Sequence, residues 1–236
     1  MEKLLNELVE KLQKAFGERL VSIVLYGSAA SGEYRAHFSD LNILCVLTEV
    51  TPRELGAGEQ IFRWWRSQGS PSPLLLSEEE FYGSSDTFAI EFHDIQRQHR
   101  VLHGKEVTKS LVVDDSFYRA QVEHDLRAKL LRLRQKAAGI LSEEDLLRRL
   151  LVDSLSTFCV LFRHALVLHG AEPPATKREI IAQANERFGV DPAPFSKLLD
   201  IREELVKPAD VAPVALLGSY LQGIGVVIAA VDRLEK

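Results

Sequence analysis

Residues 20–47, LVSIVLYGSAASGEYRAHFSDLNILCVL, decide the fold of the N-terminal half of this chain. The two ends of the stretch, residues 20–26 and 41–47, are short apolar runs rich in β-branched side chains, which is typical of buried strands. Between them, Gly27 and Ser28 open a loop of small and polar residues. The stretch therefore predicts a strand, a turn, a loop and a second strand.

Polar residues lie where these two predicted strands end and begin. Asp40 and Asn42 are two positions apart, so along a strand they point to the same face of the sheet. Backbone amides at Gly27 and the Ser28 hydroxyl can donate to phosphate oxygens, and a carboxylate can hold a divalent metal that bridges them. This spacing predicts a phosphate and metal site. The alternatives are an ordinary turn, a capping Asp40 and a solvated Asn42 amide.

A third carboxylate is expected further along the N-terminal half. FAIEFHDI, residues 88–95, predicts another buried strand, with Glu91 at its middle and Asp94 on the opposite face. Glu91 is the first choice for the site and Asp94 the second. A buried carboxylate needs a partner, so an ion pair of Glu91 with Arg97 or Arg100 is the alternative.

The remaining segments complete an α+β fold. The N-terminal half is expected to be a small mixed sheet with flanking helices over residues 1–108, and the C-terminal half an all-α helical bundle over residues 115–236. In the first half we expect helices over residues 2–16 and 52–68 and a short strand over residues 74–76. In the second we expect helices over residues 117–138, 142–169, 176–188, 193–206 and 211–234.

Composition narrows the class of protein. The 236 residues carry a net charge of −5, which argues against a nucleic-acid binder that relies on bulk electrostatics. Residues 1–108 hold 11 basic and 16 acidic side chains, so this charge belongs to the half with the predicted site. Cys45 and Cys159 lie in apolar runs, which favours reduced thiols and a cytoplasmic location. The acidic N-terminus is unlike a signal peptide.

The most apolar stretch, residues 214–231, contains glycines and polar residues. We expect a buried helix here rather than a membrane span. This helix packs either within the chain or across a homodimer.

The strand, Gly27-Ser28, the loop and Ser39-Asp40-Leu41-Asn42 together resemble the motif of the DNA polymerase β-like nucleotidyltransferases, most of all the small bacterial minimal and aminoglycoside nucleotidyltransferases. The resemblance implies transfer of a nucleoside monophosphate from an NTP, with ATP expected, to a hydroxyl of a small molecule or protein. It implies Mg²⁺ or Mn²⁺ held by Asp40, Asn42 and Glu91, and phosphate held by Gly27 and Ser28. Asp40 and Glu91 would then be the catalytic carboxylates.

One residue departs from that motif. The family has an aspartate where this chain has Asn42, and an amide oxygen can coordinate Mg²⁺ but brings no negative charge. A slow enzyme, a nucleotide binder with one metal and a catalytically inactive regulatory or antitoxin-like protein are all compatible with this change.

Three weaker patterns lie outside the motif. Arg163 and His169 resemble the arginine–histidine pair of HEPN-type ribonucleases, which gives a third hypothesis: a helical ribonuclease domain regulated by the N-terminal fold. His99 and His103, near His93, are expected on one helical face, either as zinc ligands or as satisfied surface side chains. Residues 117–138 form a basic helix whose charges are either solvated or reach a triphosphate in a cleft between the halves.

Overall fold

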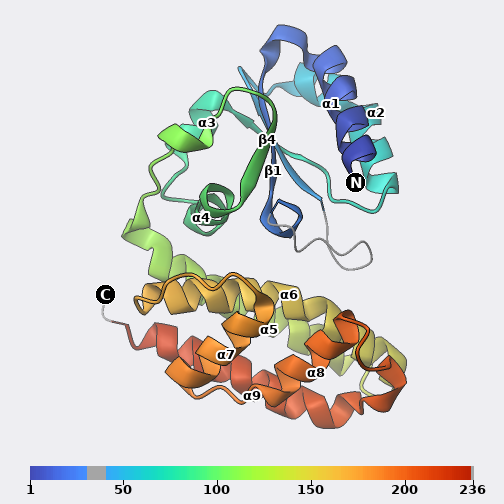
Figure 1. Ribbon diagram of the computed structural model, residues 1–236, viewed down its shortest axis with the longest axis vertical. Coiled ribbons are helices and arrows are strands. Elements are labelled where there is room, and N and C mark those ends of the chain that lie inside the picture. The colour runs from blue at the N-terminus through green and yellow to red at the C-terminus, as the bar shows by residue number, and fades with distance from the viewer. Residues whose placement is uncertain (31–40, 235–236) are drawn as a thin grey trace. The chain divides into compact units, whose positions relative to one another are not determined.

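The computed structural model describes residues 1–30 and 41–234 (Figure 1). The chain forms two compact units, the first over Met1–Phe117 and the second from Tyr118 onward. The first unit holds the sheet, and the second is helical.

The sheet of the first unit has the strand order β3-β2-β1-β4. β1 is antiparallel to both β2 and β4, whereas β2 and β3 are parallel, so the sheet is mixed, as predicted. The strands expected over residues 20–26 and 41–47 and the short strand near residue 75 are confirmed. The bounds are β1 (Leu20–Tyr26), β2 (Asn42–Leu47), β3 (Leu74–Ser77) and β4 (His99–Gly104).

The prediction of a strand over residues 88–95 is wrong. This segment forms α4 (Ala89–Arg97), and the strand that pairs with β1 follows it as β4. Phe92 and Ile95, three residues apart, both point into the core, which is the spacing of a helix. An apolar run this short fits both the period of a strand and that of a helix, so its pattern does not separate the two.

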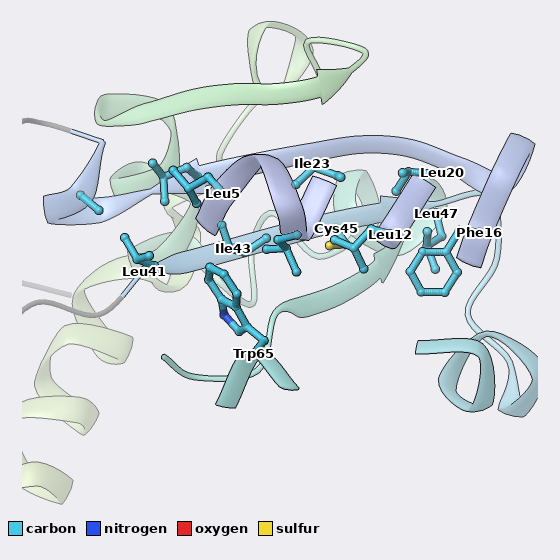
Figure 2. Packing of buried hydrophobic residues seen from close by; sticks show 13 residues of the cluster. Leu5, Leu12, Phe16, Leu20, Ile23, Leu41, Ile43, Cys45, Leu47 and Trp65 are labelled. Atoms are coloured by element: carbon cyan, nitrogen blue, oxygen red, sulfur yellow. The ribbon is translucent and has the colours of Figure 1, made fainter. Parts of the chain in front are cut away.

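Hydrophobic side chains cover both faces of the sheet. On one face, Ile23, Ile43 and Cys45 pack with side chains of α1 (Glu2–Phe16) and with Trp65 of α2 (Pro52–Ser67) (Figure 2). On the other face, Val24 and Leu44 pack with Phe81 of α3 (Glu78–Gly83) and with Phe92 of α4. Burial on both faces explains why β1 and β2 are nearly continuous apolar runs rather than alternating ones.

The second unit is built around its longest helix, α6 (Glu144–Leu168), which packs against the other four long helices of this unit in the described chain. Phe158, Phe162, Phe195 and Tyr220 form an aromatic core with ring centroids 4.8–6.5 Å apart. The four partners of α6 are α5 (Tyr118–Ala138), α7 (Lys177–Phe188), α8 (Ala193–Arg202) and α9 (Pro213–Asp232).

α6 and α9 are also long and apolar enough, by length and composition alone, to cross a membrane. In this unit they contact each other, and 56% of the most apolar window of α6 and 44% of that of α9 are buried. Tyr220 of α9 is completely buried, and its hydroxyl forms a 3.0 Å hydrogen bond with Ser154 of α6. The contacts are those of core helices.

Candidate functional site

The predicted phosphate-binding turn lies at the end of β1. The chain leaves this strand through a short 3₁₀ turn, Gly27–Ala29, and the Gly27 amide donates to the Gln98 carbonyl, 3.1 Å away, just before β4. Gly27 has φ of +75°, and a Cβ at this position would lie 3.3 Å from Nδ2 of Asn42. Glycine therefore permits both the left-handed turn and the close approach of the Asn42 amide.

A row of three side chains crosses the sheet beside this turn. Tyr26 pairs with Asn42 on β2 and with His99 on β4. Residues opposite each other in antiparallel strands point to the same face. Val24 and Leu44, two positions along from Tyr26 and Asn42, belong to the core under α3 and α4. The row therefore lies on the face of the sheet that α4 covers.

α4 brings two carboxylates to this row. Glu91 and Asp94 are three residues apart on the helix and so share one side of it. Burial, followed by the charges of Glu91 and Asp94, raises the pKa of the Tyr26 hydroxyl to about 12. Both carboxylates are thus electrostatically coupled to the phenol at the end of β1.

The predicted positions of these carboxylates need correction. Glu91 is exposed on a helix rather than central in a buried strand, and Asp94 lies on the same side as Glu91 rather than on the opposite face. The reason is the repeat of each element: residues three apart point to opposite faces of a strand but lie on the same side of a helix. Arg100, one of the two arginines considered as a partner of Glu91, instead pairs with Glu2, with its Nη2 3.1 Å from both carboxylate oxygens.

The other predicted ligands are described in part. Gly27 and Asn42 lie together, whereas Asp40 and the side chain of Ser28 fall outside the described part of the structure. Among the described residues, no group of three or more His, Cys, Asp or Glu side chains is arranged to hold a metal ion. The donors at the row are the Asn42 amide oxygen and the α4 carboxylates, and such hard oxygen ligands suit Mg²⁺ better than softer metals.

The three histidines have separate partners. His99 Nε2 is 2.8 Å from Thr108 Oγ1, and His103 Nδ1 is 2.9 Å from Gln13 Nε2 of α1. The expectation that His99 and His103 share a helical face is wrong, because both belong to β4. Nothing in the described residues supports the zinc alternative.

Two contacts near α4 have no signal in the sequence. His93 Nε2 donates to Oδ1 of Asp115 at 2.6 Å, and Gln96 Nε2 donates to the Leu111 carbonyl at 2.6 Å. These partners are 22 and 15 residues apart, and no local pattern predicts such pairings. The position of Tyr26 near the site could have been predicted from the sequence. Tyr26 ends the first predicted strand, so it pairs with the polar residue that begins the second.

The residues behind the ribonuclease hypothesis lie in the second unit. His169 follows the end of α6, and its ring packs edge-on against Phe188, with centroids 4.8 Å apart. Burial lowers the pKa of His169, and Arg187 donates to its carbonyl at 2.9 Å. These contacts fasten α7 to the end of α6, and the ribonuclease hypothesis stays a prediction.

Part of the basic helix is neutralised within the second unit. Arg119 and Arg127 of α5 both donate to Glu123 at 2.9 Å. The hydrogen bond from Arg127, followed by that from Arg119, holds the pKa of Glu123 below its usual value against the opposing effect of burial. These two guanidinium groups thus have structural partners on their own helix.

A glycine turn, a second strand that starts with a polar residue and carboxylates brought over the same face of a mixed sheet define a nucleotidyltransferase fold. The sequence model of the nucleotidyltransferase domain family matches residues 2–153, which is more than half of the chain. The chain therefore belongs to this family. No curated protein matches it significantly.

Two solved structures are similar to this chain, one over nearly its whole length and the other over just over half of it. Spectinomycin adenyltransferase AAD(9) from Enterococcus faecialis, with ATP and spectinomycin, is 13% identical with a TM-score of 0.57, over 98% of this chain and 99% of that chain. The toxin–antitoxin MntA-HpeT is 14% identical with a TM-score of 0.33, over 59% of this chain and 96% of that chain. At this level of identity, the first match shows a shared fold.

Proposed function

We propose that this chain transfers a nucleoside monophosphate from an NTP, with ATP as the expected donor, to a hydroxyl of a small molecule or protein. The observation that carries the proposal is the convergence at one end of the sheet: Asn42 lies against the Gly27 turn, and Glu91 and Asp94 are coupled to the neighbouring Tyr26. Family membership supports the reaction class. The ATP and spectinomycin of the AAD(9) structure support ATP and a small-molecule acceptor as the first to test.

The site residues divide the work of this reaction. The Gly27 N–H is bonded to the Gln98 carbonyl, so the amides that follow it in the turn, with the Ser28 hydroxyl, would donate to phosphate oxygens. Asp40, Asn42 and an α4 carboxylate supply oxygen ligands for Mg²⁺, which when bound neutralises charge on the phosphates. The acceptor oxygen forms a bond to the α-phosphorus as the bond to the bridging oxygen breaks, and pyrophosphate leaves with that electron pair. Glu91 or Asp94 accepts the proton of the hydroxyl.

Asn42 favours a second candidate function, nucleotide binding without chemistry. This residue lies in the row beside the turn, where its neutral amide contributes no charge against the repulsion between two metal ions. A regulatory protein that binds an NTP with one metal would tolerate this. Asn42→Asp separates the two candidates: it raises metal affinity and transfer if Asn42 is a ligand, and changes neither if Asn42 lies outside the metal site.

Calorimetry with each NTP in the presence of Mg²⁺ tests both candidates. We expect binding of an NTP by the wild type and its loss in Asp40→Asn. Glu2→Gln is the matched control, because it removes the charge of another carboxylate of the first unit, one paired with Arg100. Binding that does not depend on Asp40 would overturn both candidates.

Pyrophosphate release then decides whether bound nucleotide reacts. It is measured with a panel of hydroxyl compounds that starts with spectinomycin. Release that requires one acceptor supports transfer. Tight binding with no release for any small molecule or protein acceptor supports the regulatory candidate.

A cytoplasmic location is part of the proposal. Cys45 and Cys159 are both buried, and no disulfide joins the described residues, which fits a protein of a reducing compartment. Alkylation of rapidly lysed cells under denaturing conditions tests this, with both thiols expected to react without prior reduction.

A further inference from the structure

α4 is seated on the sheet by apolar contacts. Phe92 and Ile95 belong to the core under this helix, and the Phe92 ring lies 5.2 Å from that of Phe81. Such contacts turn one stripe of the helix toward the sheet, but they are less directional than hydrogen bonds.

Directional bonds hold one flank of α4. His93 donates to the Asp115 carboxylate and Gln96 to the Leu111 carbonyl, both at 2.6 Å. His93 and Gln96 are three residues apart and so lie on one side of the helix. Both partners belong to the segment after β4, which includes the short turn Asp115–Phe117. Two bonds along one flank, to one segment, restrict the rotation of the helix.

The candidate carboxylates lie on the opposite flank. At 3.6 residues per turn, positions two apart are about 200° apart around the axis. His93 is thus nearly opposite Glu91, and Gln96 is nearly opposite Asp94. Any rotation that breaks the bonds on one flank displaces both carboxylates on the other.

We propose that His93 and Gln96 are positioning residues, whose bonds to Asp115 and Leu111 orient Glu91 and Asp94 toward the end of the sheet at Tyr26 and Asn42. The proposal rests on the proposed function, in which one α4 carboxylate takes the proton of the acceptor. Because misplacing a reacting group by about 1 Å can lower a rate about 10²-fold, the effect should fall on kcat.

Variants of His93 test the proposal. His93→Ala should lower kcat by about 10²-fold and leave the KM for the NTP nearly unchanged. His93→Gln, whose amide nitrogen can reach the place of Nε2, should restore most of the rate. Arg100→Ala is the control, because it removes a different exposed side-chain bond of the first unit, that to Glu2. The proposal is overturned if His93→Ala behaves like Arg100→Ala, or if His93→Gln does not restore the rate.

A second measurement keeps the proposal testable if the wild type shows no transfer. The ¹³Cζ resonance of Tyr26, assigned with Tyr26→Phe, reports the charges beside the phenol. We expect it to move in His93→Ala, to return in His93→Gln and to stay fixed in Arg100→Ala. A resonance that does not move in His93→Ala shows that the carboxylates kept their places and overturns the positioning role. Absence of NTP binding in the wild type overturns the proposed function alone.

Discussion

The two units use their polar side chains differently. In the second unit, buried guanidinium groups of α6 and α8 bond to backbone carbonyls. Arg148 of α6 donates to Val211, just before α9, at 3.1 Å, and Arg202 of α8 donates to Val152 of α6 at 3.2 Å. In the first unit, Asn42 lies beside an open glycine turn, and Glu91 is exposed on α4. Polar groups of the second unit thus stabilise its helices, while the proposed function assigns those at the end of the sheet to binding and catalysis. We therefore expect substitutions at the end of the sheet to change activity, and substitutions in the core of the second unit to change stability.

The largest effect is expected from the α4 carboxylates. Glu91→Gln combined with Asp94→Asn should lower the rate of transfer by about 10²–10⁴-fold, because a positioned proton acceptor contributes that much. Pyrophosphate release under saturating NTP measures the rate, and urea unfolding measures the stability of the variant so that the rate is compared only for folded protein. The single variants tell which carboxylate acts. An unchanged rate in the double variant would place the base elsewhere.

In the core of the second unit, we expect a substitution to lower stability and to leave NTP binding unchanged. Phe195 is fully buried between Phe162 and Tyr220, with ring centroids 5.3 and 4.8 Å away. Phe195→Ala should lower the free energy of unfolding by about 3–5 kcal/mol through lost contacts and a cavity. Urea unfolding measures this, and calorimetry under native conditions should give the wild-type affinity for NTP. A weakened NTP affinity in the folded variant would contradict the division of roles.

A smaller effect on both properties is expected at the turn itself. Gly27→Ala places a Cβ in a left-handed conformation, which costs about 1–2 kcal/mol, and forces the Asn42 amide to shift. Stability and NTP affinity should therefore fall together. Gly189→Ala, in the second unit, is the control, because Gly189 is also left-handed, with φ of 74°, but no atom lies within 4 Å of its missing Cβ. Equal affinities in the two variants would show that the shift of Asn42 is immaterial.

The smallest expected effect is on the loss of stability at acidic pH. The pKa of Glu106 is held below its usual 4.5, chiefly by hydrogen bonds from Thr108 and also by the nearby His99. Desolvation acts in the opposite direction. A carboxyl whose folded pKa is lowered stabilises the protein above the unfolded value, and this contribution is lost as pH falls below it through the folded pKa. Unfolding monitored between pH 7 and pH 3 should show a shallower acid loss in Glu106→Gln. The same slope in both proteins would contradict this.

Much of the fold could be predicted, because long segments carry an unambiguous period. The apolar runs at residues 20–26 and 41–47 and the long helices of the second unit belong to this class. FAIEFHDI does not: its eight residues fit two periods, and the choice between them moves Asp94 from one side of the element to the other. Short segments are settled by tertiary packing, here that of Phe92 and Ile95 against the sheet.

The candidate site also contains features that depend on local spacing and features that depend on the packing of distant segments. Asn42 lies close to the Gly27 turn because the two residues stand at the adjoining ends of paired neighbouring strands, a closeness that follows from local spacing. The coupling of Tyr26 to α4 and the bond of His93 to Asp115 depend on where distant segments meet. Such pairings arise from packing, and no motif within a single segment records them.

The position of β1 in the middle of the sheet has a consequence for synthesis. On the ribosome, β1 meets β2 as soon as residue 47 has emerged, but its other edge pairs only with His99–Gly104. The nascent chain therefore presents the unpaired backbone of β1 while about fifty further residues are translated. Such an edge can recruit strands from other chains, so aggregation and chaperone binding are expected to compete with folding during this interval.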